Sequence, residues 1–225
     1  MILDNLKKIR YCLDAAAKRA GRDPGRVGLV VVTKYATTEQ IREAIASGMV
    51  SEIGESRIQS AEAKKSELGE LAQKVRWRLI GHLQTNKARK AADLFDAVDS
   101  VDSPRVAQAL ENALAPLGKS LPVLVQVKLT DRDTQGGVAP DALEGLLREL
   151  QAHQHLRASG LMAIAPQAAS PDEVRPHFRR MRGLFDRFFA GQPGAQLSMG
   201  MSSDYEVAVE EGATLVRLGS VVFGH

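Results

Sequence analysis

Lys34 stands at the carboxyl end of a strongly apolar run, the segment GLVVVT at residues 28–33. If the side chain turns into the protein, loss of water favours its neutral amine, the nucleophile that forms a Schiff base with a carbonyl compound. If it turns outward, the lysine only marks the point where a strand leaves the core for water. The position leaves both interpretations open.

Two loops near the C-terminus could bind a phosphate group. The first is the segment MGMSSD at residues 199–204, and the second contains Gly219 and Ser220. Backbone N–H groups, the hydroxyls of Ser202 and Ser220 and the missing side chain of Gly219 all suit a bound anion. The simpler interpretation is that Ser203 caps a helix and that Gly219 makes a turn. Because both loops occur together, we favour a phosphate site.

Arg217 interrupts an apolar segment, TLVRLG at residues 214–219. An unpaired buried guanidinium is costly, so this side chain needs a partner, either an acidic residue of a neighbouring strand or a ligand. A lysine, a phosphate site and an inward arginine together suggest a phosphorylated aldehyde held covalently, as pyridoxal 5′-phosphate is. Aldolase-type barrels also combine a lysine with phosphate binding, so this pattern alone does not decide.

These side chains need a scaffold that brings distant segments to one edge. Short apolar, β-branched runs alternate with amphipathic segments along the whole chain. The predicted strands cover residues 28–33, 49–54, 75–81, 96–101, 122–129, 159–164, 196–201 and 214–219. The predicted helices lie near residues 1–20, 38–47, 56–73, 84–93, 104–116, 140–154, 172–190 and 204–211. The helix start signals are Thr37 with Gln40, Ser203 with Glu206, and Pro104 after Ser103.

This alternation predicts a parallel α/β fold, either a closed (β/α)8 TIM barrel or an open doubly wound sheet. The chain begins with a helix and is expected to end on a strand, so the N-terminal helix can close the outer ring. The end of the first predicted strand and the segment after it read TKYATTEQ, which lacks the dinucleotide-binding fingerprint G-x-G-x-x-G expected of a doubly wound sheet of the Rossmann type. We therefore expect one barrel domain over residues 1–225, with its site at the carboxyl ends of the strands.

Composition argues against several classes of function. The 225 residues carry Lys+Arg 30 against Asp+Glu 27, and only Phe 6, Trp 1 and Tyr 3 are aromatic, too few to stack bases. The single Cys12 excludes an internal disulfide and a thiolate-clustered metal site, and suits a reducing compartment. No metal site is expected from the histidines. With no targeting segment or membrane span in the pattern, we expect a cytoplasmic protein.

Positive charge is nevertheless concentrated locally. Residues 56–90 hold nine Lys or Arg against Glu62, Glu67 and Glu70, and a second basic group lies at residues 175–187. Nucleic-acid or partner binding is one interpretation. A solvated helix surface is the stronger one, because long basic side chains commonly lie along helices with their charges in water.

A family resemblance is carried by four segments and their spacing: VVVTKYATTEQIREAI, IGHLQTNKARK, SGLMAIAP and LSMGMSSDYEVAVEEGATLVRLGSVVFG. They resemble the pyridoxal phosphate homeostasis protein family, single-domain barrels related to the barrel domain of alanine racemase. The resemblance implies that Lys34 forms the internal aldimine with pyridoxal 5′-phosphate. It also implies that Ser202, Gly219 and Ser220 hold the phosphate. Arg217 is implied to face the pyridine nitrogen.

The sequence departs from the family pattern at two places. The family usually has Gly-Glu-Asn where this chain reads Gly54-Glu55-Ser56, and Trp-His-Phe where it reads Trp77-Arg78-Leu79. Ser56 is shorter than asparagine and has no amide, so a contact between this position and the ring of the cofactor does not follow from the resemblance.

The expected mechanism follows from Arg217. A permanently charged donor facing the pyridine nitrogen discourages its protonation, which makes the ring a weak electron sink. A racemase also needs a second base, which alanine racemases take from a separate β-domain for which no residues remain here. Tyr205 is the best remaining candidate, because Tyr35 is expected to point away from Lys34.

We therefore expect a protein that holds pyridoxal 5′-phosphate for intracellular homeostasis with little or no turnover. The alternative is a racemase-like enzyme that uses this cofactor on an amino acid. The expected partners are the small-molecule cofactor and apo-enzymes that accept it, and the resemblance favours a monomer.

Overall fold

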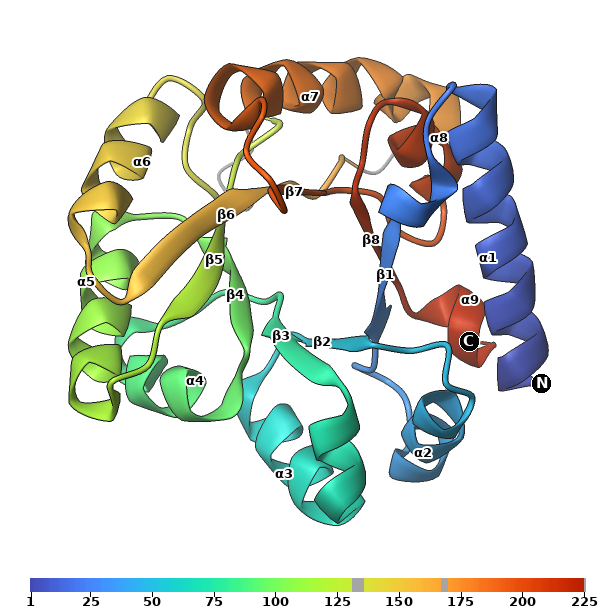
Figure 1. Cartoon of the computed structure of the whole chain (residues 1–225), viewed down its shortest axis with the longest axis horizontal. Coiled ribbons are helices and arrows are strands. Elements are labelled where there is room, and N and C mark those ends of the chain that lie inside the picture. Colours follow the sequence, from blue (N-terminus) through green and yellow to red (C-terminus); the bar gives the residue numbers. More distant parts are fainter. Residues whose placement is uncertain (131–135, 167–169, 225) are drawn as a thin grey trace.

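Parallel strands close into a barrel in the computed structural model, which describes residues 1–130, 136–166 and 170–224 (Figure 1). The strands follow one another around the barrel in chain order, and β8 pairs with β1, with Val30 opposite Arg217. The strands are β1 Gly28–Val32, β2 Glu52–Glu55, β3 Arg76–Leu79, β4 Ala97–Val101, β5 Leu121–Gln126, β6 Leu156–Met162, β7 Gln196–Ser198 and β8 Leu215–Leu218. The predicted (β/α)8 TIM barrel is confirmed.

Helices surround the barrel (Figure 1). They are α1 Ile2–Arg19, α2 Thr38–Ala46, α3 Ile58–Leu68, α4 Ala88–Leu94, α5 Pro104–Leu114, α6 Leu143–Ala152, α7 Arg175–Phe189, α8 Tyr205–Glu210 and α9 Ser220–Phe223. The N-terminal helix α1 packs against α8 and α9 and completes the outer ring, as predicted. The expectation that the chain ends on a strand is wrong, because the short helix α9 follows β8.

Local hydrogen bonds explain where several helices begin. Thr37 accepts a hydrogen bond from the N–H of Gln40, and the Gln40 side chain accepts one from the N–H of Thr37, which is the predicted capping box. The Ser103 side chain caps α5 by accepting a hydrogen bond from the N–H of Val106. The capping box predicted at Ser203 is wrong: Asp204 is the N-cap of α8, and its carboxylate closes the preceding turn instead.

Side-chain alternation along the strands separates two interior regions. The region between strands and helices is apolar, and Trp77 and Phe178 are its largest fully buried side chains. The lumen of the barrel is partly polar. In β8, Val216 and Leu218 pack among the helices, whereas Arg217 between them faces the lumen, because successive strand residues point to opposite faces.

Candidate functional site

Lys34 lies in the turn that follows β1, just beyond Val32. Its side chain is exposed, and its Nζ lies 4.6 Å from the ring centroid of Tyr35, which is exposed as well. The Lys34 ammonium lowers the pKa of the Tyr35 phenol, first by a hydrogen bond and then by its charge, with a smaller effect from Arg57. Of the two interpretations of Lys34, the structure therefore agrees with the outward one, in which the side chain stays in water. The expectation that Tyr35 points away from Lys34 is wrong, because strand alternation stops where β1 ends.

Arg217 is held in the lumen by neutral partners. Its Nη1 donates to the Ser198 hydroxyl of β7 at 2.6 Å, and its Nη2 donates to the Ala163 carbonyl oxygen just after β6 at 2.9 Å. Burial lowers the pKa of Arg217 to about 10, although Asp99 and Asp204 oppose that shift by their charge. The guanidinium therefore stays protonated at neutral pH. Neither of these two acceptors is acidic. Of the two partners considered from the sequence, an acidic residue of a neighbouring strand or a ligand, the first is therefore not seen in these hydrogen bonds.

The loop after β7 is shaped by a glycine that no other residue could replace without strain. Gly200 has a φ of +95°, and a Cβ at this position would lie 2.6 Å from the Cβ of Ala208. The next turn is closed by a hydrogen bond from the N–H of Met201 to Asp204 Oδ1 at 2.7 Å. Ser202 lies half-buried inside this turn. The loop thus holds Ser202 at the carboxyl end of the barrel.

The loop after β8 brings Gly219 and Ser220 beside the strand that carries Lys34. A Cβ on Gly219 would lie only 3.0 Å from the carbonyl oxygen of Val32, so the ends of β1 and β8 approach closely there. Ser220 is exposed and begins α9, whose first N–H groups have no partner within the helix. The β1–β8 pairing therefore places Lys34, Gly219 and Ser220 at one rim of the barrel.

The donor set fits a phosphorylated aldehyde. Hydroxyls and backbone N–H groups of Ser202, Gly219 and Ser220 suit a phosphate, and a Cβ at Gly219 would crowd the Val32 carbonyl oxygen at 3.0 Å. An amine and a donor-only guanidinium complete the set at the same end of the barrel. The predicted site residues thus lie in or just beyond β1, β7 and β8. β7 and β8 are consecutive paired strands, and β1 joins them because the barrel closes.

Tyr205 lies at the start of α8, and its hydroxyl contacts the thiol of Cys12 on α1. Burial, and then the hydrogen bond with Cys12, raises the pKa of the Tyr205 phenol. Because α1 belongs to the outer ring of helices (Figure 1), the contact with Cys12 places this hydroxyl against that ring. Its place does not suit a second base for a reaction at Lys34.

Arg78 forms a buried polar network inside the barrel. Its guanidinium donates to both carboxylate oxygens of Asp99 at 2.8 Å, to Glu52 at 3.0 Å and to the Gln196 side chain at 2.8 Å. Because β3 and β7 are not neighbours, the bond to Gln196 crosses the lumen. Because Gln196 precedes Ser198 on β7, this network lies nearer the amino-terminal end of the barrel than Arg217 does.

Two charged residues close to Lys34 are not apparent as site residues from the sequence. Glu55 ends β2 and is 1% exposed, and Lys64 of α3 contacts it. The sequence signal that could have indicated them is Glu55 at the buried end of the segment EIGE, because a buried carboxylate requires a partner.

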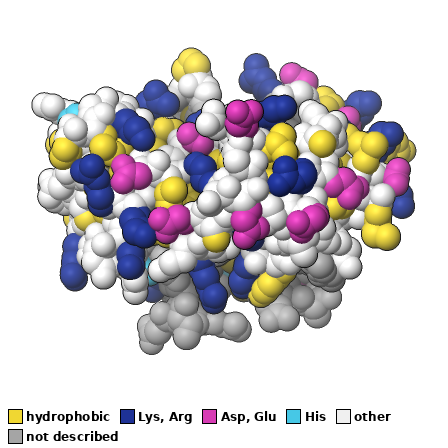
Figure 2. All heavy atoms as spheres, turned by 90° about the horizontal axis from the view of Figure 1, so that it is seen from below, with side chains coloured by type: hydrophobic (Ala, Val, Ile, Leu, Met, Phe, Trp, Pro, Cys, Tyr) yellow, Lys and Arg dark blue, Asp and Glu magenta, His cyan; other side chains and the backbone are white. Residues whose placement is uncertain are grey.

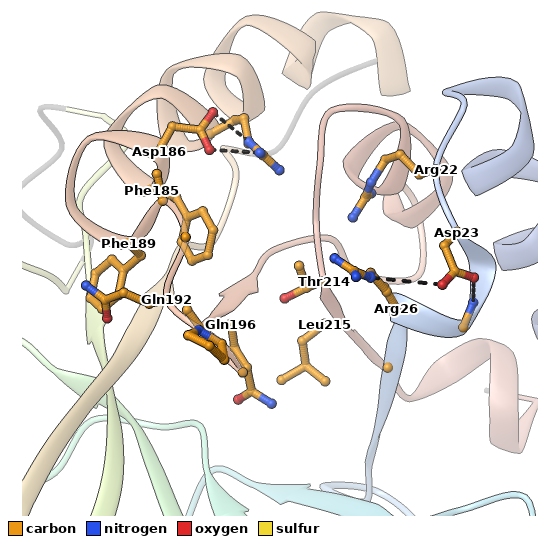
Figure 3. Close-up of a pocket in the computed structure, with 18 of the residues that line it drawn as sticks. Arg22, Asp23, Arg26, Phe185, Asp186, Phe189, Gln192, Gln196, Thr214 and Leu215 are labelled. Atoms are coloured by element: carbon orange, nitrogen blue, oxygen red, sulfur yellow. Dashed lines mark hydrogen bonds and ion pairs between the residues drawn. The ribbon is translucent and has the colours of Figure 1, made fainter.

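A cavity of about 1190 Å³ opens at the opposite, amino-terminal end of the barrel (Figure 3). It is lined by residues at the starts of strands, such as Leu215 of β8. Two of its arginines already have partners, because Arg182 pairs with Asp186 at 2.8 Å and Arg22 donates to the Ala213 carbonyl oxygen at 2.8 Å. This cavity is separate from the site at the carboxyl ends of the strands.

The basic segments are largely neutralised in the fold. On the side of the molecule that carries α3, Lys/Arg and Asp/Glu side chains are interspersed (Figure 2). Lys90 pairs with Glu62 at 3.0 Å, and Arg89 lies 3.6 Å from Asp93. Further pairs are Arg76–Glu52, Lys64–Glu55, Arg175–Glu211, Arg179–Glu211 and Arg187–Glu144. These pairs favour a solvated surface over a nucleic-acid interface.

Among residues 1–130, 136–166 and 170–224, no three His, Cys, Asp or Glu side chains are grouped so that they could hold a metal ion. In the same ranges, the helices lack the length and apolar character that crossing a membrane requires. Gln135, which begins the Gln-Gly-Gly segment of a predicted loop, and the histidine His225 lie outside the described residues.

The fold and site define a class: a closed (β/α)8 barrel with a lysine beyond β1, a buried arginine in β8, and serine- and glycine-containing loops after β7 and β8. The family described as alanine racemase, N-terminal domain, matches residues 5–225. An alanine racemase from Clostridium difficile shares the fold, with a TM-score of 0.70 at 15% identity over 99% of this chain and 57% of that one.

Within that class, the chain belongs to the pyridoxal phosphate homeostasis protein family. A relative of that name from Pseudomonas aeruginosa is 38% identical over 223 residues, which cover 99% of this chain and 95% of the relative. The structure of PipY from Synechococcus elongatus, with PLP bound, has a TM-score of 0.86 and 37% identity, with 100% of both chains covered.

Proposed function

We propose that this chain binds pyridoxal 5′-phosphate at the carboxyl end of its barrel and holds it covalently on Lys34, with little or no turnover, for intracellular homeostasis of the cofactor. The observation that carries the proposal is the similarity over the whole chain to PipY, whose structure has PLP bound. The names of the curated relatives support the same role.

Lys34 supplies the attachment point. Its Nζ forms a C=N bond with the aldehyde carbon of the cofactor and one water molecule leaves, so the linkage is reversible. The exposed position of Lys34 at the rim lets a soluble aldehyde reach it without opening the fold. Ser202 and Ser220 donate hydroxyl hydrogen bonds to the phosphate, and Gly219, which has no side chain, leaves the backbone N–H groups of its loop accessible to it.

Arg217 limits the chemistry that can follow. With a pKa of about 10 it keeps its proton at neutral pH and has no lone pair with which to accept one. Placed against the pyridine nitrogen, it disfavours a proton on that nitrogen, and a carbanion at an amino-acid Cα gains little stabilisation. The position of Tyr205 against Cys12 leaves it unsuited as a second base. Both features favour a holder over a racemase.

The test is spectroscopic. Purified chain mixed with pyridoxal 5′-phosphate should show the absorbance band of a protein-bound imine, and borohydride should fix the label on the peptide that contains Lys34. Lys34→Ala should abolish both signals. Lys18→Ala, which removes an exposed lysine of α1, is the matched control and should retain them. A labelled lysine other than Lys34, or no band at all, would overturn the proposal.

Turnover and delivery are tested separately. A racemase predicts deuterium incorporation from solvent at the Cα of an added amino acid, whereas a holder predicts none across the common amino acids. Delivery to apo-enzymes predicts that the loaded chain activates an apo-enzyme that requires this cofactor in the presence of a scavenger of free aldehyde. We further propose that the chain acts as a monomer, which light scattering of the loaded protein can test.

A further inference from the structure

Thr33, the residue before Lys34, is fixed through every polar group it has. It is fully buried, and its N–H donates to the Gly54 carbonyl oxygen at 3.1 Å, which continues the β1–β2 pairing. Its hydroxyl donates to Glu55 Oε1 at 2.7 Å. Its carbonyl oxygen accepts from the N–H of Ala36 at 3.0 Å, which closes a turn with Lys34 and Tyr35 at its centre.

Lys64 completes the arrangement from α3. Its Nζ donates to the Thr33 carbonyl oxygen at 2.5 Å and to Glu55 Oε1 at 2.5 Å. Thr33, Glu55 and Lys64 therefore form a closed ring of hydrogen bonds, which we call the Thr33 clamp. The Lys64 side chain is 13% exposed and that of Glu55 is 1% exposed, so little water competes for these bonds.

A buried ion pair is an expensive way to pack a helix on a strand. Removing two charges from water costs several kcal/mol, and well-packed apolar residues of similar volume often do as well for stability. Unlike an apolar pair, the Thr33 clamp fixes the carbonyl and hydroxyl groups of Thr33. Through them it fixes the orientation of the peptide bond between Thr33 and Lys34. This peptide bond leads into Lys34, whose exposed side chain lies only against the ring of the equally exposed Tyr35.

We propose that Glu55 and Lys64 are positioning residues, which act through Thr33 to hold the turn that presents Lys34 to the aldehyde of its ligand. This rests on the proposed function, because it takes Lys34 as the attachment point. Since the clamp lies in the layer between β2 and α3, whereas the phosphate loops follow β7 and β8, it acts on the linkage and not on the phosphate.

The experiment compares two ligands. Pyridoxal 5′-phosphate can form the imine, whereas pyridoxine 5′-phosphate has an alcohol in place of the aldehyde and uses only ring and phosphate contacts. In Lys64→Met, the rate of imine formation should fall about tenfold or more, because a displacement of about 1 Å is costly for a reacting group. The affinity for pyridoxine 5′-phosphate should stay within about twofold of wild type. Lys64→Arg, which keeps donors and charge, should recover most of the rate.

Lys65→Met is the matched control. Lys65 is the next residue of α3, donates to the Leu94 carbonyl oxygen at 2.5 Å and lies over the Trp77 ring, so it is comparably buried but does not contact Thr33. It should leave the rate of imine formation unchanged. If Lys64→Met fails to fold, the double variant Glu55→Gln with Lys64→Met leaves no unpaired buried charge, and the same comparison applies to it.

The outcomes separate cleanly. A wild-type rate in the clamp variants, or an equal loss of affinity for both ligands, overturns the positioning role while the proposed function stands. If the wild-type chain forms no imine on Lys34 but still binds pyridoxine 5′-phosphate, the proposed function fails, and the positioning role fails with it.

Discussion

Replacing Arg78 with methionine should be one of the most damaging single changes in the barrel interior. Arg78 is 2% exposed and makes hydrogen bonds to Asp99, Glu52 and Gln196. Methionine fills much of the volume but leaves Asp99, which is fully buried, without its cation. Removing one partner of a buried pair costs about 3–5 kcal/mol of unfolding free energy. At about 2–4 °C per kcal/mol for a chain of this size, Tm should fall by about 6–20 °C.

The assay is thermal and denaturant unfolding followed by circular dichroism. Arg76→Met is the control, because Arg76 lies on the same strand, is 54% exposed and contacts Glu52 at only 3.5 Å. Exposed pairs of this kind contribute about 0–1 kcal/mol. Adding Asp99→Leu to Arg78→Met should cost less than the sum of the two single changes, because the stranded carboxylate is removed. A loss under about 1 kcal/mol in Arg78→Met, or strict additivity in the double variant, would refute this reasoning.

Three further predictions concern the rim and the surface. Gly219→Ala places a Cβ 3.0 Å from the Val32 carbonyl oxygen, so the ends of β1 and β8 must separate slightly. The affinity for pyridoxine 5′-phosphate, measured by titration calorimetry, should therefore fall about tenfold. Tyr205→Phe should leave the imine absorbance band and its rate of formation unchanged, and a large loss would show that the hydroxyl reaches the site. Burial alone would raise the pKa of Glu111, but hydrogen bonds from the His155 side chain and nearby backbone N–H groups lower it below its ordinary 4.5. A carboxyl whose pKa is lower in the folded than in the unfolded chain stabilises the fold at pH values above its unfolded pKa. Wild type should therefore exceed Glu111→Gln in unfolding free energy by about 1–2 kcal/mol at pH 7, and this difference should disappear as the pH falls below 4.5. A difference that stays constant down to pH 3 would contradict this assignment.

The fold was predictable because its signals are local. Each strand is a short apolar run and each helix has an apolar face, and these periodicities depend only on neighbours in the chain. The inward direction of Arg217 also follows from its place between Val216 and Leu218. The capping box at Thr37 was predictable for the same reason. The box predicted at Ser203 does not form, because Asp204 is the N-cap of α8 and its carboxylate accepts a hydrogen bond from the N–H of Met201.

The orientation of Lys34 could not be predicted from its position. Strand alternation predicts a direction only while the strand continues, and β1 ends at Val32, so Lys34 and Tyr35 follow the geometry of a turn. That turn is fixed by Lys64, which is distant in sequence and does not stand out among the basic residues of its helix.

By itself, the sequence determined the barrel, and the family resemblance assigned to the cofactor residues that lie in or just beyond β1, β7 and β8. Only the tertiary structure decided which charges are buried and what holds them. Arg78 reaches Gln196 across 118 residues of sequence, and such a bond exists only because closure of the barrel brings β3 and β7 to opposite sides of one lumen. Periodicity encodes which face a side chain occupies, whereas partners across a closed sheet depend on geometry that no local pattern carries.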